Sequence, residues 1–217
     1  MTAAVRMSDH RDRMRAAGGC TVCEYVGLFL AFSAAGWLWE VALHVLLDGE
    51  LVNRGTMLGP WLPIYGLGGL AAVMLLGRFA ARPPVVCALG MLLSAGIEYA
   101  AGKYLLAVYG RRWWDYSQYP LNIDGLISPL TSLLFGLGCC AVVYTAAPML
   151  LRTFRRMPYA RLRMVCVLVM ALFVLDFGVS TLHPNTGQGI TVAPVTQDGL
   201  RVIEPAQISL LLQNLPK

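Results

Sequence analysis

Three carboxylates interrupt apolar stretches of the sequence that are long enough to cross a bilayer. Glu40, Glu98 and Asp176 each lie about six to ten residues, ~9–15 Å of helix, before the end of such a stretch. A carboxylate that faces lipid costs ~2.5–3.5 kcal/mol on an insertion scale, so these side chains should face inward, paired or protonated. Carboxylates in different environments can also serve as general acid and base. The three acids are therefore candidate functional residues.

Each acid belongs to a stripe of small or polar residues at helical spacing. Small residues let helices approach closely, and we expect the three stripes to face one another. The alternative is that the polar side chains form only interhelical hydrogen bonds, worth ~0.6 kcal/mol each on average. The stripes are Ser33, Gly36, Glu40 and His44; Gly90, Ser94, Glu98 and Gly102; and Asp176, Ser180 and His183.

Two segments between the apolar stretches carry groups that complement the acids. The first, residues 53–66, contains Arg54 and Tyr65. Arg54 is a natural counter-ion for Glu40 or Glu98, and neutralising a buried acid explains it as well as ligand binding does.

The second segment, residues 111–125, is rich in aromatic and charged residues. An aromatic belt at the membrane boundary explains one or two of its aromatic residues but not four beside an arginine pair. Such a loop could form the floor of a pocket, with aromatic rings for stacking and arginines for an anionic group. Its candidate pocket residues are Trp113, Trp114, Asp115, Tyr116 and Asn122.

The composition indicates that these segments connect membrane helices. Of 217 residues, 57% are apolar and 13% are charged, and the mean hydropathy is +0.61. A soluble domain carries about 25% charged residues, so a disordered chain is excluded and a soluble enzyme is disfavoured. A helical span needs ~20 apolar residues. We predict an all-α polytopic integral membrane helix bundle with about five transmembrane helices, at roughly 22–47, 58–77, 85–108, 126–151 and 163–182.

Lysine and arginine residues predict the orientation of this bundle. Eleven arginines fall in segments that are cytoplasmic if the N-terminus is inside, against five basic residues on the other side. This bias favours the N-terminus inside and the C-terminus outside. The net charge of +5 is then a topology signal, and no nucleic-acid partner is expected. The predicted parts are a cytoplasmic basic segment (1–21), a five-span transmembrane domain with two motif-bearing outer loops (22–183) and an outer polar tail (184–217).

Several short motifs within residues 25–185 together resemble those of a bacterial membrane family, the putative ABC-transporter type IV or CmpB-like permeases. The resemblance implies a transport permease in the bacterial cytoplasmic membrane, and it implies no catalytic residues and no substrate. The family pattern often has an arginine after the glycine that matches Gly125, where this chain has Leu126. The motifs are Gly36-Trp37 with Glu40; Asn53-Arg54-Gly55; Gly59-Pro60; Pro63-Ile64-Tyr65-Gly66; Trp113-Trp114-Asp115-Tyr116-Ser117; Asn122 with Gly125; and His183-Pro184-Asn185.

Three functions remain open from the sequence. The favoured one is a permease component of an ATP-driven transporter; the chain has no P-loop, so its ATPase would be a separate subunit and the chain would not itself be an enzyme. The second is a membrane-embedded enzyme that acts on a lipid or lipid-linked substrate at the outer leaflet. The third is a regulatory or partner-binding membrane protein, and a homo-oligomer would enlarge the limited interior of the bundle. A single C-x-x-C, Cys20 to Cys23, is too weak to predict a metal site, and no cofactor is expected.

Overall fold

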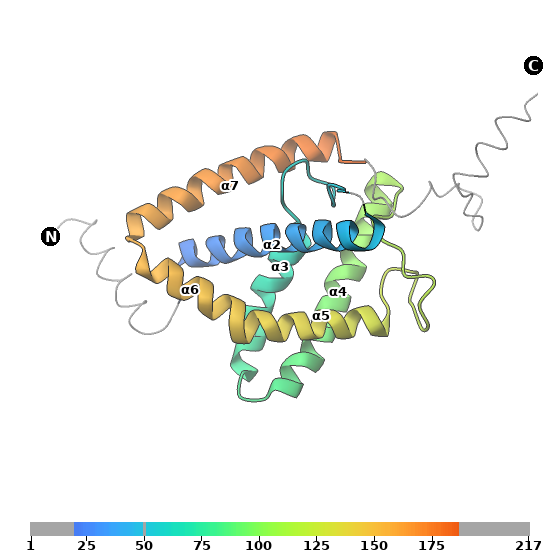
Figure 1. The fold of residues 1–217 in the computed structure, drawn as a ribbon, viewed down its shortest axis with the longest axis horizontal. Coiled ribbons are helices and arrows are strands. Elements are labelled where there is room, and N and C mark those ends of the chain that lie inside the picture. The colour runs from blue at the N-terminus through green and yellow to red at the C-terminus, as the bar shows by residue number, and fades with distance from the viewer. Residues whose placement is uncertain (1–19, 50, 187–217) are drawn as a thin grey trace, which may run out of the picture.

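The computed structural model describes residues 20–49 and 51–186, which fold into helices joined by turns and two longer loops (Figure 1). In the described part of the chain there is no β-strand, and Ile123 and Ile127 form an isolated bridge. The predicted all-α class is therefore confirmed. The helices are α2 (Val22–Asp48), α3 (Pro63–Ala71), α4 (Pro83–Tyr109), α5 (Pro129–Ala141), α6 (Ala147–Arg156) and α7 (Tyr159–Leu182). Short turns extend them: η1 (Ala72–Leu76) and η2 (Gly77–Phe79) follow α3, and η3 (Val142–Ala146) links α5 to α6.

Four of these helical segments are long and apolar enough to cross a membrane. They are Val22–Leu46, Pro83–Tyr109, Pro129–Arg156 and Tyr159–Leu182. The predicted number of about five transmembrane helices is close to these four. The remaining predicted span, 58–77, is the shorter apolar helix Pro63–Phe79. Pro63 occupies the first turn of α3, where its missing N–H costs nothing, and the preceding Leu62 is extended. The helix therefore begins five residues later than predicted.

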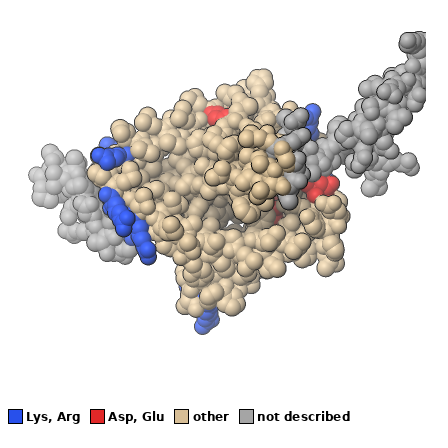
Figure 2. Space-filling view, viewed as in Figure 1, with Lys and Arg blue, Asp and Glu red and all other residues tan. Residues whose placement is uncertain are grey.

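The helices expose apolar side chains along their length. On α7, Leu168, Leu172 and Leu175 are 58%, 60% and 67% exposed. Most of the visible face in Figure 2 is likewise free of charge. A soluble monomer rarely exposes a contiguous apolar patch beyond a few hundred Å². Together with the lengths of the helices, this surface identifies a multi-pass membrane protein with lipid as its surroundings.

Helix α2 runs between α7 and the α5–α6 helix in Figure 1, and it packs against α3, α6 and α7. Its contact with α3 depends on a glycine, because a Cβ built on Gly36 would lie 2.2 Å from Cγ of Tyr65. The contact of α4 with α5 depends on another, because a Cβ on Gly90 would lie 3.3 Å from Cα of Gly136. The small residues of the predicted stripes thus permit two close helix contacts, and at Gly36 the α2 stripe faces α3.

Basic residues gather at the end of the bundle where α6 meets α7 (Figures 1 and 2). At the same end, Glu24 is fully buried and accepts a hydrogen bond from the backbone N–H of Thr21 at 2.7 Å, completing a capping box for α2. Its other oxygen lies 3.2 Å from Nε of Arg155. The basic end is therefore joined internally by an ion pair between α2 and α6, a contact that the sequence did not predict.

Candidate functional site

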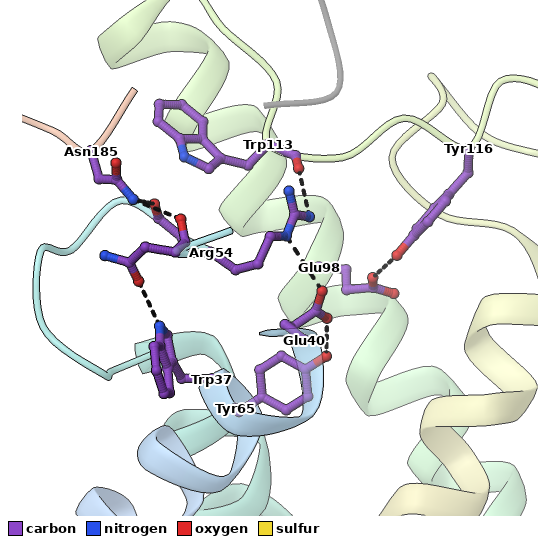
Figure 3. Close-up of polar contacts among 10 residues, drawn as sticks. Trp37, Glu40, Arg54, Tyr65, Glu98, Trp113, Tyr116 and Asn185 are labelled. Carbon is purple, nitrogen blue, oxygen red and sulfur yellow. Dashed lines mark hydrogen bonds and ion pairs between the residues drawn. The ribbon is translucent and has the colours of Figure 1, made fainter. Parts of the chain in front are cut away.

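Glu40 lies in the last third of α2, toward the opposite end of this helix from Glu24. It is the centre of a polar cluster (Figure 3). Nε of Arg54 lies 3.6 Å from Oε2 of Glu40. The hydroxyl of Tyr65, on α3, donates a hydrogen bond of 2.5 Å to Oε1 of the same carboxylate. Of the two partners that the sequence allowed for Arg54, the structure selects Glu40.

Glu98 on α4 joins this cluster from the other side. Its side chain is 5% exposed, and its Oε1 accepts a hydrogen bond of 3.2 Å from the hydroxyl of Tyr116. Figure 3 shows the Glu98 carboxylate beside that of Glu40, and the charge of Glu40 acts on it. Among the described residues, Oε2 of Glu98 has no hydrogen-bond partner. Burial raises the pKa of Tyr116 well above its usual range, and the Glu98 carboxyl adds to this, so the phenol remains a donor.

Arg54 links the two loops across the cluster. Its Nη2 donates a hydrogen bond of 3.2 Å to the backbone carbonyl of Trp113 in the second loop. Trp113 is itself 4% exposed and packs its ring edgewise on Tyr109 at 5.5 Å. Nη1 of Arg54 is buried, and no described residue accepts from it. Arg54 thus fixes the position of loop two relative to α2 while keeping one unused donor.

The backbone around Arg54 is held by residues that the sequence did not single out as site residues. Nε1 of Trp37 donates to Oδ1 of Asn53 at 2.6 Å, and Nδ2 of Asn53 donates to the carbonyl of Leu58 at 2.8 Å. Nδ2 of Asn185 donates to the backbone carbonyl of Asn53 at 2.8 Å. Trp37, Asn53 and Asn185 all belong to the motifs that carry the family resemblance, which was the available signal. They position Arg54 from three separate parts of the chain.

Asp176 on α7 binds the backbone of the first loop (loop one, the part of residues 53–66 before α3) instead of joining the other two acids. Its Oδ2 accepts from the backbone N–H of Gly59 at 2.9 Å, and its Oδ1 accepts from Leu58 at 3.3 Å. The hydroxyl of Ser180 donates to Oδ1 at 3.0 Å. The carboxylate of Asp176 is thus occupied by loop donors. The side chain of His183 is exposed, and its backbone N–H donates to the carbonyl of Val179 at 2.8 Å, where α7 ends.

The remaining predicted residues of loop two shape the loop itself. Oδ1 of Asp115 accepts from the backbone N–H of Ser117 at 2.9 Å, and Oδ1 of Asn122 accepts from that of Gly125 at 3.0 Å. Nε1 of Trp114 donates to the carbonyl of Leu126 at 2.9 Å. These contacts hold the loop in the conformation that presents Tyr116 to Glu98.

The cluster consequently combines two carboxylates, one guanidinium and two phenols, with an unused acceptor on Glu98 and an unused donor on Arg54. Such a set can bind a proton, or a polar solute once the side chains move apart. In the described part of the chain, no group of three or more His, Cys, Asp and Glu side chains is placed to hold a metal ion.

A family model described as "Putative ABC-transporter type IV" matches residues 27–181. The matched region contains all five residues of the polar cluster, together with Asp176. No curated protein and no solved structure matches the chain significantly.

Proposed function

Since the chain belongs to the family described as putative ABC-transporter type IV, we propose that it is the permease subunit of an ATP-driven transporter. Its family and its four apolar helices make it a membrane transport component. We further propose that the transported solute passes through one polar cluster, which consists of Glu40, Arg54, Tyr65, Glu98 and Tyr116. We place the protein in the bacterial cytoplasmic membrane, with the cluster near the outer face.

The observation that carries this proposal is the incomplete pairing of the cluster. Ionisable residues within membrane segments are costly, and those that are kept mark ion or solute pathways. A purely structural group would be expected to satisfy its buried polar atoms, as Asp176 does with two backbone N–H groups. Arg54 and Glu98 each leave one buried atom without a described partner. These two atoms can bind a solute once the side chains around them move apart.

The basic end of the bundle is the proposed docking surface for a separate ATPase. Arg152 and Arg156 on α6 and Arg161 and Arg163 on α7 are exposed. Arg155 differs from them because it pairs with the buried Glu24. A variant of Arg155 would therefore disturb the fold, whereas variants of its neighbours test docking alone.

A pull-down from the native membrane tests the permease proposal. The tagged chain is solubilised in mild detergent, co-purifying proteins are identified by mass spectrometry, and ATP hydrolysis is measured. We expect a stoichiometric ATPase. The double variant Arg156→Glu with Arg161→Glu should lose it, because both side chains are exposed at the proposed docking surface.

The matched control is Arg111→Glu, which reverses an exposed arginine in the second loop. It should leave the association unchanged. A preparation with no ATPase would contradict the proposal and would favour an enzyme that acts on a lipid substrate. Equal loss with the control variant would instead show a general effect of charge and would remove the docking surface.

A further inference from the structure

Glu98 stands apart from the other deeply buried carboxylate of the described chain in how few partners it has. Oε1 of Glu98 accepts one hydrogen bond, from the neutral hydroxyl of Tyr116, and Oε2 accepts none. Glu24 is buried equally well, yet it accepts from a backbone N–H at 2.7 Å and lies 3.2 Å from Nε of Arg155. Burial alone therefore does not explain the isolation of Glu98.

The charges that face Glu98 do not compensate an ionised carboxylate. Helix α2 contributes Glu40 and loop one contributes Arg54, and these two pair with each other at 3.6 Å. Helix α3 contributes the Tyr65 hydroxyl, which donates to Glu40, and loop two contributes the Tyr116 hydroxyl. An ionised Glu98 would leave the cluster with one uncompensated negative charge. Burying such a charge without a partner is so unfavourable that the group takes up a proton instead.

We propose that Glu98 is a proton-binding site: it holds an exchangeable proton at neutral pH while Arg54 pairs with Glu40. The role of this proton in a transport cycle rests on the permease function proposed above. When the proton leaves, the O–H bond of the carboxyl breaks, the proton passes to water, and the carboxylate that remains can draw Arg54 away from Glu40. The pairing of Arg54 would then report whether the site is protonated.

A proton fits this site without any rearrangement. Oε2 of Glu98 is fully buried, so a solute cannot touch it in this conformation. A proton needs only the oxygen atom and a route, and the Tyr116 hydroxyl bonded to the other oxygen extends from the carboxyl toward loop two. In this conformation Glu98 can therefore bind a proton but not a solute.

Infrared spectroscopy of the full-length chain in lipid nanodiscs tests this proposal directly. The wild-type protein at neutral pH should show a carboxylic-acid C=O band that shifts in deuterated water and disappears at alkaline pH. Glu98→Gln, which has the shape of the neutral acid, should lose that band. Glu24→Gln is the matched control, because it removes a buried carboxylate that has full partners, and it should keep the band.

Tyr116→Phe provides a second reading that does not depend on removing the carboxyl. It removes the donor to Oε1 of Glu98, so the band should persist and move to higher frequency. A wild-type spectrum without the band, an undiminished band in Glu98→Gln, or an unmoved band in Tyr116→Phe would each overturn the proposal. None of these spectra requires an ATPase. A missing ATPase in the pull-down would therefore refute the permease function alone, and a missing band would refute the proton site alone.

Discussion

Replacing Arg54 with glutamine should destabilise the protein by leaving Glu40 without its cation. The guanidinium lies 3.6 Å from the Glu40 carboxylate, and the two side chains are 12% and 24% exposed. Arg54 also donates to the carbonyl of Trp113 in loop two. Arg54→Gln therefore removes one ion pair and one loop contact while keeping a polar, uncharged side chain.

The magnitude follows from burial. Removing one partner of a fully buried ion pair costs ~3–5 kcal/mol, whereas an exposed pair is worth ~0–1 kcal/mol. The side chain of Glu40 is about a quarter exposed to solvent, and in the variant it retains the hydrogen bond from Tyr65. We therefore expect Arg54→Gln to lower the free energy of unfolding by ~2–3 kcal/mol.

A double-mutant cycle in detergent micelles measures this effect. The free energy of unfolding is determined for the wild type, Arg54→Gln, Glu40→Gln and the double variant. Since the double variant leaves no unpaired charge, it should be more stable than the sum of the single losses predicts, with a coupling of ~1–3 kcal/mol. Lys103→Gln is the control: Nζ of Lys103 lies only 2.7 Å from Asp124, but the side chains are 47% and 46% exposed. It should cost much less than Arg54→Gln, because solvent screens an exposed ion pair.

Additivity would refute the reasoning. If the losses from Arg54→Gln and Glu40→Gln add to within ~0.5 kcal/mol, the two side chains do not act as a pair. A loss from Lys103→Gln as large as that from Arg54→Gln would show that separation, and not burial, decides the worth of these ion pairs.

Three further variants test the parts that position the cluster. Gly36→Ala would place a Cβ 2.2 Å from Cγ of Tyr65, so the ring must move and the melting temperature should fall, with a loss of ~1–3 kcal/mol from overpacking; an unchanged melting temperature would contradict the close contact. Asp176→Asn keeps the shape but turns an N–H group toward the backbone donors of residues 58–59, so hydrogen exchange there should accelerate, and unaltered protection would show that Asp176 does not hold these residues. Gly125→Ala forces a non-glycine residue to φ +66°, which costs ~1–2 kcal/mol in unfolding measurements; a smaller loss than for an alanine placed at an exposed helical glycine would argue against strain.

The helical class and the membrane setting could be predicted from composition and span length because both depend on local patterns. The second span illustrates where this fails. Residues 58–77 are apolar throughout, yet helix α3 begins only at Pro63. The backbone N–H groups of Leu58 and Gly59 bind Asp176, which lies more than a hundred residues later in the chain. Pro63 in the first turn of α3 and this tertiary contact therefore set the boundary together, and only the first of the two is a local pattern.

The sequence indicated candidate residues for the site, but it did not show which of them pair. The spacing of α4 identified Glu98, and the aromatic loop supplied Tyr116, but nothing in the sequence joins them. Arg54 could be assigned to either of two acids until the structure placed it beside Glu40. The contacts that hold the backbone around Arg54 were missed because Trp37, Asn53 and Asn185 are ordinary polar or aromatic residues, and their role appears only when three distant segments meet.

The three intramembrane acids are equivalent in the sequence, and their partners separate them. Asp176 accepts from two backbone N–H groups and a hydroxyl, which is a structural arrangement that a ligand would have to break. Glu40 has a cation and a phenol, and its pairing can change only if Arg54 moves. Glu98 has a single neutral donor and a bare oxygen. The cost of changing the charge state is smallest where the fewest partners depend on it, so the residue that the fold satisfies least is the one best placed to take up and release a proton.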